Sequence, residues 1–139
     1  MTIRAVLDAN VFVSAAIQRG PSYRIVRAWL DSDAFELIVS EAVLAEVDDV
    51  LTRPRLTKRI TAEDAHAFIH SIRVVADLAP DGVAPLAFTR DPDDDYLIAL
   101  ARAHEADVIV SGDKDLLTWP EQQPPVVAPA TFETMLGDA

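Results

Sequence analysis

The chain of 139 residues contains no cysteine. Disulfide bonds, thiolate zinc sites and cysteine nucleophiles are therefore excluded. No apolar run approaches the roughly 20 residues that a membrane-spanning helix needs, and the opening stretch MTIRAVLDANVF lacks the pattern of a secretory signal peptide. The sequence also shows no internal repeat and no low-complexity tract. We therefore expect a single domain over residues 1–139, soluble, without a membrane partner, and cytoplasmic.

Basic residues are scarce as well. The chain has 12 lysines and arginines against 23 aspartates and glutamates, which gives a formal net charge of −11. Proteins that bind nucleic acid without sequence preference contact its phosphates through Lys and Arg. The charge balance therefore argues against general electrostatic binding of nucleic acid by this chain. An acidic protein can still act on nucleic acid where its acids gather around cations and its few bases gather elsewhere. The places where acids converge therefore decide what the chain can do.

Short apolar runs alternate with amphipathic stretches along the chain. We predict strands at 3–7, 35–39, 108–110 and 126–127. We predict helices from after Asp8 to Ile17, over 22–32, from Ser40 to the residue before Pro54, over 62–76, over 94–104 and from about Thr131, with a loop at 80–93. Short apolar strands that alternate with helices indicate a parallel sheet covered on both faces. The predicted fold class is α/β, a three-layer α/β/α sandwich with a central parallel sheet.

Two of the predicted strands end in aspartate. Asp8 follows the run AVL, and Asp113 follows the run VIVSG. In an open parallel sheet the active crevice lies beyond the carboxyl ends of the strands, where the strand order reverses. An aspartate after a strand can equally cap the next helix. Two such aspartates, on strands that could be neighbours, favour a site.

The segment RDPDDDYLIALA offers a third acid. At about 100° per residue, Leu97, Ile98 and Ala101 define the buried arc of this helix. Asp94 falls within that arc, whereas Asp95 lies about 120° from its centre. Three consecutive acids could simply cap the helix and favour its dipole, but capping does not explain a charge at an inward position. We therefore expect Asp94 to point inward and Asp95 outward.

The segment SEAVLAEVDDVL offers a fourth acid. Glu46 lies about 110° from the centre of the apolar stripe, where a long side chain could reach over the edge of the sheet. Glu41 flanks the stripe in the same way, but it belongs to the first turn, where capping accounts for it. Helical phase gives Glu46 only a small preference.

Four carboxylates cannot share a pocket unaided. Two charges 4 Å apart repel by roughly 4 kcal/mol at an effective dielectric constant of 20. Either some of them stay protonated or a hard divalent cation neutralises them. Because all the donors are oxygens, that cation would be Mg²⁺ or Mn²⁺, as one ion or two. Such a site supports hydrolysis of phosphate esters, and Asn10 and Ser111 could orient a water molecule or a carboxylate.

Four segments of the chain, taken in order, resemble the motifs of a known protein family. LDANVFVSA, SEAVLAEVDDVLTRP, RDPDDDYLIALA and ADVIVSGDKDLL together resemble the PIN-domain family, and in particular its toxin branch of VapC-like ribonucleases. The resemblance runs from Ile3 to about Leu136. It implies a PIN-like fold and an Mg²⁺- or Mn²⁺-dependent endoribonuclease that cleaves single-stranded RNA. It also implies the toxin of a toxin–antitoxin pair, whose partner is a cognate antitoxin protein.

The resemblance also implies site residues. The acidic positions of the family fall on Asp8, Glu46, Asp94 and Asp113, and its polar position falls on Asn10. One position departs from the pattern, because toxin relatives often carry Asn after the third acid and this chain has Asp95. Asp94 and Asp95 are therefore partly exchangeable, and helical phase is the reason to choose Asp94.

The basic residues gather in one place. Arg53, Arg55, Lys58 and Arg59 follow the helix that carries Glu46. Such a run is usually a solvated turn, but in this acidic chain it is also the best candidate for contacting RNA phosphates.

Four further side chains have ordinary interpretations. His66 and His70 have a spacing that can hold zinc, but no third ligand is evident, so we expect them on the solvated surface. Trp29 and Phe35 are expected in the core or at a dimer interface rather than as platforms for stacked bases. A homodimer is therefore one possible assembly.

Two other functions remain open. A phosphatase of the haloacid dehalogenase type needs a second aspartate two residues after the first, where this chain has Asn10. It also needs a lysine near the phosphoryl group, and none occurs between Ile3 and Lys58. A non-enzymatic receiver or interaction domain needs paired acids before the first-strand aspartate, and the first strand opens with Ile3 and Arg4 instead.

Overall fold

The structure of the chain is a computed structural model that describes residues 2–80, 92–120 and 122–137, with the backbone alone at 92–94. Its elements follow in the order β1 (Arg4–Leu7), α1 (Ala9–Ile17), α2 (Pro21–Ser32), β2 (Glu36–Ile38), α3 (Glu41–Leu51), a 3₁₀ turn η1 (Pro54–Leu56), α4 (Ala62–Val75), α5 (Pro92–Ala103), β3 (Val108–Val110), α6 (Lys114–Leu117), β4 (Val126–Val127) and α7 (Pro129–Gly137).

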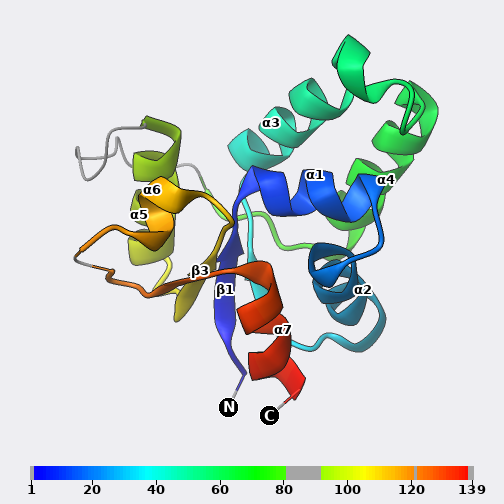
Figure 1. Cartoon of the computed structure of the whole chain (residues 1–139). Coiled ribbons are helices and arrows are strands. Elements are labelled where there is room, and N and C mark those ends of the chain that lie inside the picture. The colour runs from blue at the N-terminus through cyan, green and yellow to red at the C-terminus, as the bar shows by residue number, and fades with distance from the viewer. Residues whose placement is uncertain (1, 81–91, 121, 138–139) are drawn as a thin grey trace.

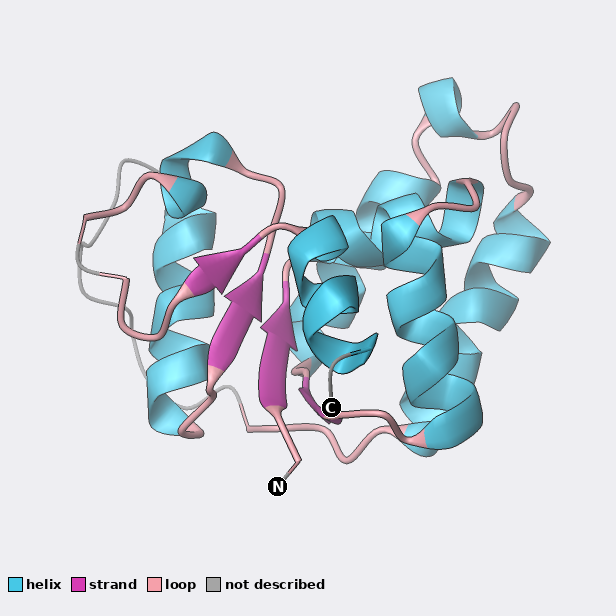
Figure 2. Cartoon of the chain, turned by 60° about the horizontal axis from the view of Figure 1, so that its bottom comes forward, coloured by secondary structure: helices cyan, strands magenta, loops and turns pink. Residues whose placement is uncertain are grey.

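The described strands form one parallel sheet in the order β2-β1-β3-β4. Helix α5 packs against β1 and β3, and Figures 1 and 2 show α5 on one side of the sheet and α7 with α1–α4 on the other. This arrangement confirms the predicted three-layer α/β/α sandwich. The chain leaves β1 toward β2 on one side and later returns to β3 on the other. The strand order therefore reverses between β1 and β3, where a parallel sheet opens its crevice.

Polar side chains define where the helices begin. The carboxylate of Asp8 caps α1, Ser40 Oγ caps α3 by accepting from the Val43 N–H at 3.4 Å, and Thr61 caps α4 by accepting from the Asp64 N–H. Because α1 and α3 begin where β1 and β2 end, the caps of these two helices lie at the carboxyl edge of the sheet. Figure 1 shows α1, α3, α5 and α6 all starting on this side.

Two short elements were not predicted, and two helices begin about two residues earlier than predicted. Helix α6 and the turn η1 are too short for a periodic apolar pattern, although Leu116 of α6 is fully buried. Helix α5 begins at Pro92 and α7 at Pro129, in line with the preference for proline in a first helical turn. Most of the loop predicted at 80–93 lies outside the described residues.

The core is continuous across the sheet. Ala5, Val6 and Leu7 of β1 are at most 1% exposed. The rings of Phe35 and Phe132 meet edge to face at 5.0 Å between centroids, an arrangement that aromatic pairs favour. Trp29 and Phe35 are both buried, so they belong to the core. Within the described part of the chain, no helix is long and apolar enough to cross a membrane.

Candidate active site

Asp8 is the buried carboxylate at the carboxyl edge. It follows β1, it is 7% exposed, and its backbone N–H donates to the Val110 carbonyl of β3 at 3.0 Å. Its Oδ1 accepts from the Asn10 N–H at 3.4 Å, and its Oδ2 accepts from the Ser111 hydroxyl at 2.8 Å. Hydrogen bonds to both oxygens hold the carboxylate in one orientation at the switch point.

Ser111 joins Asp8 to the segment that carries Asp113. Ser111 is fully buried, and while its hydroxyl donates to Asp8, its Oγ accepts from the Asp113 N–H at 3.0 Å. Asp113 Oδ1 in turn accepts from the Asp115 N–H at 2.8 Å and so caps α6. The structure therefore brings two of the sequence-selected aspartates, Asp8 and Asp113, to the same point through one serine.

The surroundings of Asp8 disfavour the ionised form of its carboxyl group. Burial is the main reason why the pKa of Asp8 is raised above its ordinary value of 3.8. The hydrogen bonds from Ser111 and Asn10 lower that pKa, and the neighbouring charge of Asp113 raises it further. A cation near the two carboxylates would relieve both the burial cost and the repulsion.

Asp95 is buried, at 7% exposure, so the prediction that it points outward is wrong. Leu100 is buried as well, but it widens the apolar arc of α5 on the side away from Asp95, so the apolar spacing does not account for the burial of Asp95. Asp95 precedes Ile98 by three residues and shares its side of the helix. The side chain of Asp94 lies outside the described residues.

A hydrogen bond ties the start of α5 to the same edge. The Tyr96 hydroxyl lies 2.5 Å from Ser40 Oγ, and Ser40 is fully buried between β2 and α3. Sequence reasoning did not select Tyr96, because its partner lies 56 positions away and no local pattern reports such a contact. The bond places the turn that carries Asp95 above the strand ends.

Glu46 and Asn10 are both exposed. Glu46 lies in the second turn of α3, the helix that begins at Ser40. Glu41, the rejected alternative, forms an ion pair with Arg73 of α4. The contact that Asn10 makes with Asp8 comes from its backbone N–H.

Among the residues that the structure describes, no group of three or more acidic or histidine side chains stands ready to hold a metal ion. Asp8 and Asp113 supply two carboxylates, and a third donor would have to come from α5 or α3. All of these donors are oxygens, which Mg²⁺ and Mn²⁺ prefer. The donor chemistry therefore fits a hard divalent cation.

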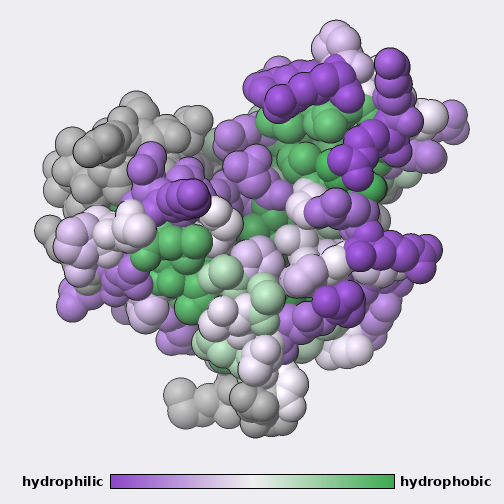
Figure 3. All heavy atoms as spheres, viewed as in Figure 1, coloured by the Kyte–Doolittle hydropathy of each residue, from purple (hydrophilic) through white to green (hydrophobic). Residues whose placement is uncertain are grey.

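The basic cluster, residues 53–59, lies at the other end of α3. Its four basic side chains are exposed, and Figure 3 shows hydrophilic side chains gathered over this turn. Arg53 is paired with Asp49 at 2.9 Å, whereas Arg55, Lys58 and Arg59 form no salt bridge within the described residues. The 11 residues of α3 span about 16 Å. The basic cluster therefore lies too far from the carboxylates at the strand ends to contact them.

His66 and His70 lie on the surface of α4, as predicted. His66 Nε2 is 3.2 Å from Asp48 Oδ1 of α3. This pair connects two neighbouring helices and lies away from the strand ends.

The fold and these contacts define an α/β protein with a buried carboxylate at the switch point of a parallel sheet. The family model of the PIN domain matches residues 4–115, and the chain belongs to the PIN-domain family. PIN domains are in general metal-dependent nucleases. The phosphatase and receiver alternatives are therefore set aside. Among curated proteins, none matches the chain.

Proposed function

We propose that this protein is an endoribonuclease that cleaves single-stranded RNA with the help of Mg²⁺ or Mn²⁺. We further propose that it is the toxin of a toxin–antitoxin pair and is bound by a cognate antitoxin protein. The observation that carries the nuclease proposal is the buried Asp8 carboxylate, held by Ser111 beside Asp113 at the β1/β3 switch point. The RNA preference and the toxin role rest on the resemblance of the four sequence segments.

The proposed metal ligands are carboxylates from four segments. They are Asp8, Asp113, Glu46 and one acid from the first turn of α5, for which the sequence favours Asp94 and burial favours Asp95. A bound divalent cation supplies positive charge for the phosphate and lowers the pKa of a coordinated water. The chain's own part is orientation, because Ser111 directs the Asp8 carboxylate and the Tyr96–Ser40 bond holds α5 over the strand ends.

The basic cluster is the proposed contact for RNA phosphates outside the reacting bond. Arg55, Lys58 and Arg59 are exposed, and no acid within the described residues neutralises them. Their separation from Asp8 by the length of α3 suits a single strand of several nucleotides, the site size of many single-strand binders. The charges would increase binding without taking part in the chemistry.

An end-labelled RNA assay tests the nuclease proposal. The purified protein should cut an unstructured RNA in Mg²⁺ or Mn²⁺, cut it far more slowly in EDTA, and leave the same sequence uncut in a duplex. Asp8→Asn should remove the activity, whereas Asp31→Asn, which removes an exposed acid paired with Arg27, should keep it. Equal cleavage by Asp8→Asn, or unchanged cleavage in EDTA, would contradict the proposal.

The RNA contact has its own test. Replacing Arg55, Lys58 and Arg59 with Gln should weaken RNA binding and flatten its dependence on salt. It should leave the stabilisation by Mg²⁺ unchanged. Arg27→Gln, which removes a cation already paired with Asp31, is the control for a lost positive charge. If the triple variant binds RNA with an unchanged dependence on salt concentration, the basic cluster is an ordinary solvated turn that does not contact RNA.

A further inference from the structure

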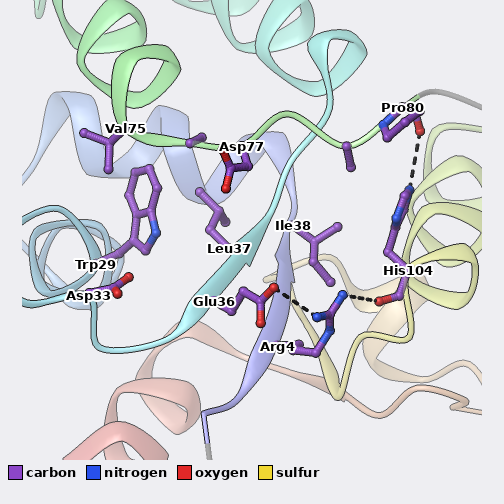
Figure 4. Close-up of a pocket in the computed structure, with 12 residues that line it drawn as sticks. Arg4, Trp29, Asp33, Glu36, Leu37, Ile38, Val75, Asp77, Pro80 and His104 are labelled. Atoms are coloured by element: carbon purple, nitrogen blue, oxygen red, sulfur yellow. Dashed lines mark hydrogen bonds and ion pairs between the residues drawn. The ribbon is translucent and has the colours of Figure 1, made fainter.

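A hollow lies along the outer side of β2, apart from the Asp8 site. It has a volume of about 270 Å³ and is lined by the first residue of β1, the whole of β2, the ends of α2, α4 and α5, and the segment that follows α4. Figure 4 shows Glu36 and Leu37 on β2, Arg4 of β1 next to Glu36, and Asp33 and Asp77 on the side of Leu37. None of these residues takes part in the proposed nuclease site.

The outer edge of β2 has backbone groups that no described strand pairs. β2 is the edge strand, and its Glu36 N–H donates to the Ile3 carbonyl, toward β1. Backbone groups of a strand alternate in direction, so the N–H and carbonyl of Leu37 face outward. The next outward carbonyl, that of Val39, already accepts from the Ala79 N–H at 2.8 Å. The outer edge therefore already pairs with Ala79 at Val39, whereas the N–H and carbonyl of Leu37 have no backbone partner among the described residues.

The charge around this edge is negative. Helices α2, α4 and α5 all end here, and the C-terminal end of a helix carries partial negative charge. Asp33 and Asp77 add two exposed carboxylates that form no ion pair within the described residues. Arg4 is the one lysine or arginine among the residues that line the hollow. Its guanidinium already donates hydrogen bonds to Glu36 at 2.9 Å and to the His104 carbonyl at 2.7 Å.

Apolar surface adjoins the same hollow. Across the described part of the chain, the exposed large hydrophobic side chains are Val74 (67%), Val75 (54%) and Leu78 (38%). Val75 lines the hollow, and the other two lie within three residues of it in sequence. Apolar residues gathered in one exposed place are typical of a protein–protein contact.

We propose that this edge binds an extended, cationic segment of a partner protein. The segment adds to β2 through the N–H and carbonyl of Leu37, places an apolar side chain against Val75, and sets Lys or Arg side chains against Asp33 and Asp77. A second copy of this chain is a poor occupant, because its net charge is −11 and the two acidic edges would repel.

The test uses a synthetic peptide of alternating arginine and valine, five residues long, and the ¹⁵N-labelled full-length protein. We expect amide shifts at Leu37, Val75 and Asp77, with slower hydrogen exchange at the Leu37 N–H. Asp33→Asn and Asp77→Asn should each weaken binding about two- to fivefold, the size of an exposed charge pair. Glu63→Gln, which removes an exposed acid at the far end of α4, should leave the affinity unchanged.

Three results would overturn the proposal. Shifts centred on Asp8 and Asp113 would mean that the peptide prefers the carboxylates at the switch point between β1 and β3. An equal loss of affinity in Glu63→Gln would mean general attraction to an acidic protein. Ethylguanidinium binding as tightly as the peptide, with the same shifts, would mean a site for a cation alone.

Discussion

Ser111→Ala is the most informative single change, because Ser111 makes two buried contacts at once. The variant loses the hydrogen bond to the Asp8 carboxylate at 2.8 Å and the acceptor of the Asp113 N–H at 3.0 Å. A hydrogen bond to a charged group contributes about 1.5–3 kcal/mol and a neutral one about 1 kcal/mol. Since Ser111 is fully buried, water cannot replace either partner without rearrangement. We expect the free energy of unfolding at pH 7.5 to fall by about 2–4 kcal/mol.

The loss should depend on pH. The pKa of Asp8 in the folded protein is raised, mainly by burial, and the Ser111 hydrogen bond lowers it. Losing that bond raises the pKa further. A raised carboxyl pKa destabilises the folded state above the unfolded-state pKa, and the penalty disappears as the pH falls toward 3.8. The destabilisation by Ser111→Ala should therefore shrink as the pH is lowered from 8 to 4.

Urea unfolding of both proteins across this pH range measures the effect, at micromolar concentration because the pI is about 4.5. Ser71→Ala is the matched control, since the Ser71 hydroxyl is half-buried and donates to the Phe68 carbonyl at 2.6 Å, with no carboxylate involved. The control should cost about 1 kcal/mol at every pH. A Ser111→Ala cost that equals the control, or that does not change with pH, would refute the reasoning.

The remaining predictions concern the carboxylates. Asp8→Asn should change the free energy of unfolding by less than about 1 kcal/mol, because the loss of a buried charge offsets the weaker helix cap. The same variant should lower RNA cleavage at least about 100-fold. Full activity in the folded variant would contradict this prediction. Asp95→Asn should lose cleavage and Asp94→Asn should keep most of it, as assayed side by side at saturating Mn²⁺; the reverse result would restore the choice made from helical phase. Mg²⁺ at 100 times its Kd should stabilise the protein by about 2.7 kcal/mol, seen as a raised thermal midpoint that Asp8→Asn lacks.

The sheet and its switch point could be predicted because they depend on local patterns. Each strand is a short apolar run, and the aspartates that follow β1 and β3 are placed by the ends of those runs. The pairing of Leu7 with Val110 then brings Asp8 and the segment of Asp113 together. Sequence reasoning reached this part of the candidate site because it needs only strand ends and a parallel order.

The first turn of α5 shows where such reasoning stops. Helical phase reports only the arc of apolar residues, and Asp95 is buried although it lies about 120° from the centre of that arc. The burial of Asp95 depends on what closes over the helix start, including the contact between Tyr96 and Ser40. Contacts between distant segments leave no periodic signal in either segment.

The hydrogen bond between Ser111 and Asp8 spans 103 positions of the chain. At the usual 5–20 residues per second of protein synthesis, the second partner is made about 5–20 s after the first. During that interval the first carboxylate can cap its helix but has neither its serine nor its fellow aspartate. A nascent chain therefore carries no assembled centre until Ser111 has been made. If the chain has the proposed ribonuclease activity, it is inactive toward the message that encodes it until Ser111 and Asp113 have been made.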